Sequence, residues 1–343
     1  MKKKIVASVL IISFLIAGLW FAQRLLMPKY MGKIVEGAMV EEYYKETTDH
    51  DVIFIGDCEV YENFSTMELW KEYGITSYIR GSSQQLVWQS YYLLEETLKY
   101  EKPKVVVFNV LSLKYDKPQK EAYNRMTLDG MKWSMSKVND IKASMTEGEN
   151  FIDYVFPILR YHSRWNELTG DDLKYIFEKD QVTHNGYYMR VDIRPQGEFP
   201  DPMPLDDYSF GENSMKYLDM MTKLCKDNGI ELVLIKAPTE YPYWYEEWDE
   251  QVKEYADQNG LNYINMIPLK DEIGLDMSVD TYDAGLHLNL TGAEKMSDYF
   301  GKWLVDTYGL EDHRNDPKYT KVYEEKIEYY NKMIEEQKNK TEE

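Results

Sequence analysis

The feature that most constrains the fold is a strand–helix alternation that recurs five times along the chain. Two short runs rich in Val, Ile and Phe are the clearest strands, DVIFI at 51–55 and KVVVFN at 104–109. Similar runs lie at 75–79, 230–237 and 261–265, and helical segments separate them. Strands that alternate with helices form parallel sheets with right-handed crossovers. The sequence therefore predicts an α/β fold with a doubly wound, mainly parallel five-stranded sheet.

A second constraint lies at the N-terminus, where 18 apolar or small residues run from Ile5 to Ala22 without a charge. As a helix this run is about 27 Å long, close to the roughly 30 Å of hydrocarbon in a bilayer. Three lysines precede it, so the positive-inside rule places the N-terminus in the cytoplasm and the rest outside. We expect a single-pass anchor in the cytoplasmic membrane, held by membrane lipid, with an extracytoplasmic domain. A cleaved signal peptide is the alternative.

The domain boundaries follow from interruptions of the strand–helix pattern. Residues 116–210 are rich in Met, Trp and Tyr and then in Pro, which predicts a mostly helical insertion. The last residues are highly charged and are expected to form a solvated helix. The predicted parts are 1–29, a lysine cluster and membrane anchor; 30–115, the first part of the α/β domain; 116–210, the insertion; 211–314, the second part of the α/β domain; and 315–343, a charged helical tail.

Composition narrows the classes of partner and cofactor that the chain can have. The chain has 343 residues and a formal net charge of −20, so its domain should repel nucleic acid. No paired-cysteine or HExxH metal motif and no phosphate-binding glycine loop occurs, which predicts neither metal nor cofactor. Cys58 and Cys225 are the two cysteines. Cys225 lies on the apolar stripe of a helix, so we expect both thiols to be unpaired.

In an open parallel sheet, ligands bind beyond the carboxyl ends of the strands. At or just after the end of each predicted strand stands a residue that can take part in catalysis or binding. Together these residues supply a thiol, a glycine amide, a carboxamide, an ammonium group and an imidazole. A nucleophile, oxyanion donors and a base are the parts of an acyl-transfer site. In strand order the residues are Asp57 and Cys58, Gly81, Asn109, Lys236, and His287 within the run DAGLHLN at 283–289.

This order resembles the four conserved blocks of the SGNH (GDSL) hydrolases, which have a flavodoxin-like sheet. The resemblance implies that Cys58 replaces the nucleophilic serine, that His287 is the base, and that Gly81 and Asn109 hold the oxyanion with the Cys58 amide. The family carboxylate usually stands three residues before the histidine, where this chain has Ala284. Asp283 is therefore our choice, with Asp280 in reserve. The VVVFNV segment also lacks the usual Gly-x-Asn-Asp.

The anchor and the insertion are similar to those of extracytoplasmic members that handle acyl groups on cell-surface glycans, including lipoteichoic-acid D-alanylation and polysaccharide O-acetylation proteins. We expect an esterase or O-acyltransferase acting on acyl esters, chiefly acetyl, of a cell-surface glycan or acylated sugar. Candidate substrate-binding residues are Asp57, Lys236 and Trp244. The alternative is a catalytically silent module that binds glycan or partners a multi-pass membrane O-acyltransferase. In that case Cys58 is a buried small side chain.

The expected topology makes a prediction for intact cells. Because three lysines precede the apolar run, the domain after Ala22 should lie outside the membrane. Protease added to intact cells should therefore degrade the domain. Full protection until the cells are lysed would contradict the predicted orientation.

Overall fold

The fold is built on one five-stranded sheet. The computed structural model describes residues 2–27, 35–177 and 179–341. The strands lie in the order β2-β1-β3-β4-β5, and every pairing between neighbours is parallel. This confirms the predicted α/β class and the parallel five-stranded sheet. The strands are β1 Val52–Gly56, β2 Ser77–Gly81, β3 Val105–Asn109, β4 Glu231–Lys236 and β5 Asn262–Asn265.

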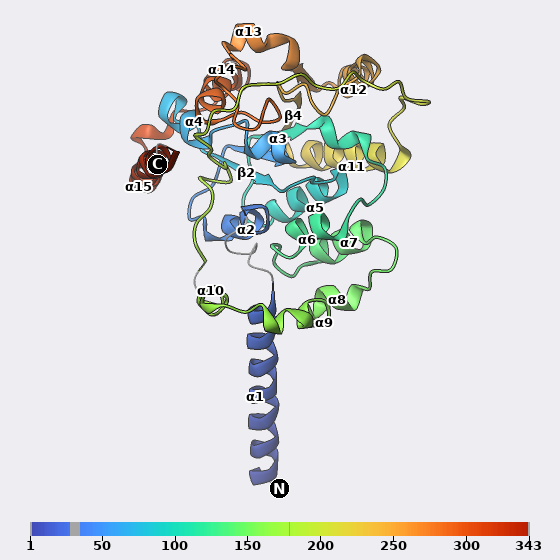
Figure 1. Ribbon diagram of the computed structural model, residues 1–343, viewed down its shortest axis with the longest axis vertical. Coiled ribbons are helices and arrows are strands. Elements are labelled where there is room, and N and C mark those ends of the chain that lie inside the picture. The colour runs from blue at the N-terminus through green and yellow to red at the C-terminus, as the bar shows by residue number, and fades with distance from the viewer. Residues whose placement is uncertain (1, 28–34, 178, 342–343) are drawn as a thin grey trace.

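Both faces of the sheet are buried. Successive side chains of a strand point to opposite faces, so one strand contributes to an apolar cluster on each side. Val52 and Phe54 of β1 pack in one apolar cluster, and Ile53 and Ile55 pack in the other. Helices supply the rest of each cluster, so they cover both faces (Figure 1). The first cluster is completed by α4 Thr66–Tyr73, α14 Leu290–Tyr308 and α15 Pro317–Thr341, and the second by α5 Val87–Thr97, α11 Glu212–Asn228 and α12 Glu246–Asn259.

The insertion between β3 and α11 begins with helices and ends without them. Its helices are α6 Glu121–Leu128, α7 Met135–Ser144, α8 Phe151–Val155, α9 Ile158–Tyr161 and α10 Gly170–Lys174. A small third cluster joins them to the domain, since Leu128 and Ile141 pack against Leu93 of α5. From 179 to 211 the chain has no helix or strand. The shorter elements elsewhere are α2 Val35–Glu42, η2 Tyr43–Lys45, α3 Cys58–Tyr61, η3 Val110–Lys114, η4 His162–Asn166, η5 Ile267–Leu269, α13 Lys270–Ile273 and η6 His313–Asn315.

The N-terminal helix α1, Lys2–Leu26, extends away from the domain (Figure 1). It is long and apolar enough to span a membrane, and its most apolar stretch has no residue buried in the protein. A helix with the length and composition predicted for a membrane anchor is therefore present. The predicted boundary between residues 29 and 30 lies outside the described residues.

The C-terminal helix α15 corrects one expectation. The tail is helical and charged, but it is not a fully solvated helix, because Tyr323 and Tyr330 are completely buried. The ring of Tyr323 stacks on Trp70 of α4, with ring centroids 4.0 Å apart. The hydroxyl of Tyr330 hydrogen-bonds Ser65 at 3.2 Å. The last helix is thus part of the core on one face of the sheet.

This packing predicts a large cost for truncating Tyr323. Tyr323→Ala should lower the free energy of unfolding of the full chain by about 3–5 kcal/mol, as expected when a buried aromatic side chain is removed. Glu324→Ala, at the exposed neighbouring position, is the matched control and should change it by less than about 0.5 kcal/mol. Urea unfolding in detergent measures both. Equal, small effects would show that α15 does not contribute to the core.

Candidate functional site

The first part of the candidate site is the junction between β1 and α3. Gly56 has a φ of +154°, and a Cβ there would lie 2.6 Å from a methyl carbon of Val60, so only glycine fits. Asp57 is the N-cap of α3, and its carboxylate accepts a hydrogen bond from the Glu59 amide at 3.2 Å. The strand therefore passes directly into the helix. This turn places Cys58 at the carboxyl edge of the sheet.

The second part is the loop before α14. Ala284 and Gly285 have φ values of +69° and +98°, which turn the chain tightly. The turn brings Asp283 back onto the residue four positions later, so that its carboxylate accepts a hydrogen bond from the His287 amide at 2.8 Å. Asn289 then caps α14 by accepting a hydrogen bond from the Gly292 amide. The histidine is thus held just before a well-capped helix.

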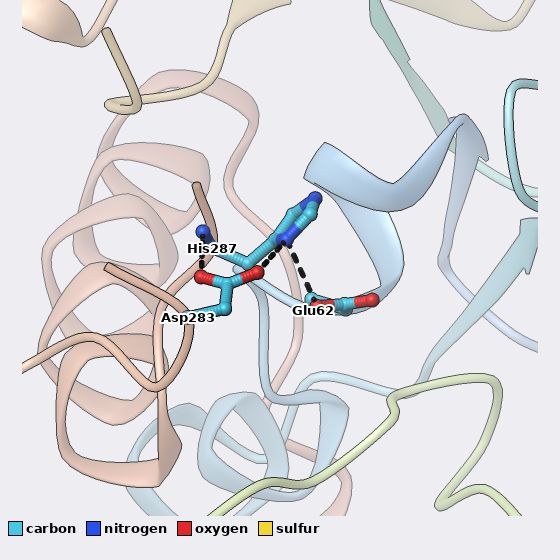
Figure 2. Close-up of side chains that lie close together, drawn as sticks. All are labelled: Glu62, Asp283 and His287. Carbon is cyan, nitrogen blue, oxygen red and sulfur yellow. Dashed lines mark hydrogen bonds and ion pairs between the residues drawn. The ribbon is translucent and has the colours of Figure 1, made fainter. Parts of the chain in front are cut away.

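The structure brings Cys58, His287 and Asp283 together. The Nδ1 atom of His287 lies 2.7 Å from an oxygen of Asp283, and Figure 2 shows this nitrogen facing the carboxylate. The thiol of Cys58 lies close enough to the imidazole for the two groups to shift each other's pKa. Because Nδ1 faces the carboxylate, Nε2 is the ring nitrogen that remains for the thiol. The imidazole thus connects the thiol with the carboxylate.

Sequence reasoning missed a second carboxylate at this imidazole, that of Glu62. An oxygen of Glu62 lies 3.3 Å from the same Nδ1 atom (Figure 2). Glu62 is buried and accepts a hydrogen bond from the hydroxyl of Tyr282, whose ring lies face to face with the imidazole. The signal was available, because Glu62 follows Cys58 by four residues, one helical turn. His287 therefore sits between two carboxylates.

Asp280, the reserve choice for the orienting carboxylate, has a different role. Its oxygens accept hydrogen bonds from the Thr291 hydroxyl at 2.9 Å and from the Lys295 ammonium group at 2.6 Å. It therefore fastens the first turns of α14. The geometry favours Asp283 over Asp280 as the partner of His287.

Asn109 lies at the predicted edge of the sheet, but neighbouring residues already use its hydrogen-bonding groups there. Its amide nitrogen donates to the carboxylates of Asp57 and Glu59, both at 3.0 Å. Its amide oxygen accepts a hydrogen bond from the Ala237 amide at 3.3 Å. A carboxamide has two N–H donors, and both are used. An oxyanion role for Asn109 stays a prediction and would require it to release one of these carboxylates.

The structure does not support Lys236 and Asp57 as substrate contacts. Lys236 is fully buried, and its ammonium group lies 2.8 Å from a carboxylate oxygen of Glu59. Asp57 is buried as the cap of α3 and as a partner of Asn109. Both side chains serve internal contacts. Gly81 ends β2 beside Gly56, as predicted, and a Cβ there would lie 3.1 Å from the Gly56 carbonyl oxygen, so its close packing also explains the glycine.

The protonation of the thiol–imidazole pair follows from burial and charge. Burial raises the pKa of the Cys58 thiol to about 11, and the carboxylates of Asp57 and Glu62 add to this, against the opposing effect of His287. Burial alone would lower the pKa of His287. Its hydrogen bond to Asp283, its interaction with Cys58 and the charge of Glu62 outweigh burial and raise that pKa well above the usual value. These shifts favour a neutral thiol beside a protonated imidazole.

Glu62, Asp283 and His287 also offer ligand atoms that all lie within 4.8 Å of one another, close enough to hold a cation. Metal ligation by Nδ1 would require breaking its hydrogen bond to Asp283. The hydrogen-bonded arrangement accounts for all three side chains without a metal. The predicted absence of a metal stays a prediction.

A cleft of about 710 Å³ adjoins the His287 loop. A Cβ on Gly285 would lie 2.7 Å from Gln196 and 3.0 Å from Phe199, two residues that line the cleft. Trp244, a predicted substrate contact, also lines it but is only 7% exposed. The more accessible rings are those of Tyr241 and Tyr243. The loop 194–202 thus links the cleft to the candidate site.

The remaining cysteine lies elsewhere. Cys225 is buried within α11, and both cysteines are free, as expected.

No protein-family model matches this chain, and no curated protein matches it. The function must therefore be argued from the residues and their geometry.

The two carboxylates at Nδ1 predict the titration of His287. Glu62→Gln removes one negative charge beside the imidazole, so the pKa of His287 should fall. NMR titration of the imidazole carbon signals measures it, and the other histidines of the chain are internal controls. An unchanged His287 midpoint would mean that Glu62 does not stabilise the imidazolium.

Proposed function

We propose that this chain is a membrane-anchored, extracytoplasmic esterase or O-acyltransferase with the doubly wound SGNH-type fold, acting on acyl esters of a cell-surface glycan. The observation that carries the proposal is the grouping of Cys58, His287 and Asp283 at the carboxyl edge of a parallel sheet, with the imidazole hydrogen-bonded to Asp283 and interacting with the thiol. A nucleophile, a base and an orienting carboxylate in this order are the parts of covalent acyl transfer.

The proposed reaction has two steps. The sulfur of Cys58 attacks the ester carbonyl carbon while the thiol proton passes to Nε2 of His287. The tetrahedral intermediate collapses, the sugar oxygen leaves with that proton, and an acyl thioester remains on Cys58. Water or a second sugar hydroxyl then attacks the thioester, gives its proton to His287 and releases the thiol. Hydrolysis and transfer thus share one intermediate and differ in the acceptor.

The pH dependence of this reaction follows from the pKa of His287. Nε2 can accept the thiol proton only when the imidazole is neutral, and the two carboxylates raise the pKa of His287 well above its usual value. The competent fraction therefore grows as pH rises through that pKa. Turnover should increase on the alkaline side of neutrality.

The adjoining cleft supports a sugar substrate. Aromatic side chains offer flat apolar faces and polar edges, which suits the mixed surface of a sugar ring. Tyr241 and Tyr243 are 40% and 44% exposed, and Phe199 stacks on Tyr241. The cleft is also lined by three carboxylates, Glu198, Asp201 and Glu240, which disfavour an anionic polymer. A neutral glycan carrying acyl esters fits this lining.

A second function is favoured by a specific observation. The amide donors of Asn109 are both used by carboxylates, and burial holds the pKa of Cys58 at about 11. A chain with an occupied oxyanion donor and a neutral thiol suits a catalytically silent module. Such a module would bind glycan in the cleft or partner a multi-pass membrane O-acyltransferase.

Acyl-enzyme trapping separates the two functions. The full chain in detergent, mixed with p-nitrophenyl acetate, should gain one acetyl group on Cys58, seen by peptide mass spectrometry. Cys58→Ala should gain none there, and His287→Ala should acetylate about 10²–10⁴-fold more slowly, the usual contribution of a positioned base. Cys225→Ala controls for loss of a thiol outside the site and should react at the original rate.

The rate of Cys58 acetylation should also rise with pH in the unsubstituted chain, whereas Cys58→Ala should gain no acetyl group at this position at any pH. Acetylation of Cys58 at the rate of a free thiol, unchanged in His287→Ala, would reject the enzyme. It would leave the silent module as the better proposal.

A further inference from the structure

A segment of the insertion exposes apolar side chains beside the end of α1. Residues 151–177, here called the arch, comprise α8, α9, η4 and α10 and cross the end of α1 where the domain begins (Figure 1). Soluble surfaces rarely expose large clustered apolar side chains without a reason. The exposed ones in the arch are Ile152, Phe156, Leu159, Trp165, Leu173 and Phe177.

The arch has two different sides. Tyr154, Tyr161 and Ile176 are buried, and the guanidinium of Arg125 from α6 lies 4.0 Å from the centre of the Tyr154 ring. These residues fasten the arch to the domain. The exposed apolar side chains therefore point away from these contacts, into whatever medium surrounds the base of the domain.

Two arginines fix the arch at a definite height along α1. Arg24 of α1 donates a hydrogen bond to the carbonyl oxygen of Ile176 at 3.1 Å. Arg164 of the arch donates to the carbonyl oxygens of Leu26 and Met27 at 2.7 and 2.5 Å, which caps the end of α1. Arg24 follows the last residue of the apolar run, Ala22, by two positions, or about 3 Å along the helix axis. The arch is thus level with the end of the apolar run.

We propose that the arch is a membrane-surface foot whose exposed apolar side chains enter the interfacial layer of the bilayer that α1 spans. The inference rests on the anchoring role proposed for α1 and not on acyl chemistry. The occupant is lipid, because the exposed apolar side chains of the arch continue the exposed apolar surface of α1 at the depth where that surface ends. Interfacial segments of this kind bury their apolar side about 5–10 Å into the headgroup boundary.

The foot has a consequence for the rest of the molecule. A span joined to a domain by a free tether would let the domain tilt and rise. Here the arch is hydrogen-bonded to α1 on one side and packed on the domain on the other. The domain is therefore held at a fixed height and orientation over the bilayer.

Spin labels test this depth directly. Trp165→Cys and Phe177→Cys are made in the full chain, labelled, and reconstituted in nanodiscs of phosphatidylcholine and phosphatidylglycerol. The two side chains are 72% and 78% exposed, so their replacement leaves the packing intact. Met203→Cys is the matched control, because Met203 is 78% exposed and its carbonyl oxygen bonds Tyr245 beside α12, at the other end of the domain from α1 (Figure 1). The unsubstituted chain, labelled in parallel, gives the background from Cys58 and Cys225.

Labels at 165 and 177 should be accessible to oxygen and shielded from a water-soluble nickel chelate, whereas the label at 203 should show the reverse. A label-free measurement checks this: brominated lipids should quench the tryptophan emission of the unsubstituted chain more than that of Trp165→Phe. Aqueous profiles at 165 and 177 in protein that stays in the discs would overturn the foot and leave both the anchor and the acyl chemistry standing. Protein that does not enter the discs would overturn the anchor and the foot together.

Discussion

The carboxylate of Glu59 is buried among the three chain segments that form the edge of the candidate site. The ammonium group of Lys236 lies 2.8 and 3.0 Å from its oxygens, the Thr239 hydroxyl donates at 2.6 Å, and the amide of Asn109 donates at 3.0 Å. These contacts join α3 to the ends of β3 and β4. Losing one partner of a buried ion pair leaves the other uncompensated, which costs about 3–5 kcal/mol. The position of Cys58, the residue before Glu59, therefore depends on this network.

The network also separates the roles of neighbouring residues. Sequence order assigned Lys236 to substrate and Asn109 to an oxyanion, since both follow strands at the right edge. Both side chains are buried, and their N–H groups donate hydrogen bonds to the carboxylates of Asp57 and Glu59. At this edge the reactive groups that remain accessible are those of Cys58 and His287. The side chain of His287 is 17% exposed. The adjoining cleft extends this surface through residues 194–202, which contact the turn at Ala284 and Gly285.

The sheet could be predicted because its signal is local and repeated. Apolar strands such as 104–109, separated by helices with glycine ends, leave few alternatives to a parallel sheet. The edge of the site followed from the same alternation. The contacts of Glu59 could not be predicted, because its partners lie 50 and 177 residues away in the sequence. The burial of α15 had a visible signal, since Tyr319, Tyr323 and Tyr330 repeat at helical spacing, but the many charges of that helix masked it.

The two proposed functions differ in whether the imidazole of His287 can lose its proton. The carboxylates of Asp57, Glu62 and Asp283 act on the thiol or the imidazole, and the ammonium group of Lys114 also interacts with the thiol. This surplus of negative charge favours a proton on His287 and opposes a negative charge on Cys58, so burial and charge together raise the pKa of the thiol. A neutral ester bound over Cys58 does not change that balance. Catalysis therefore needs the imidazole to lose its proton before the thiol can give up its own, and a site in which that loss never occurs is a binding site with the geometry of an enzyme.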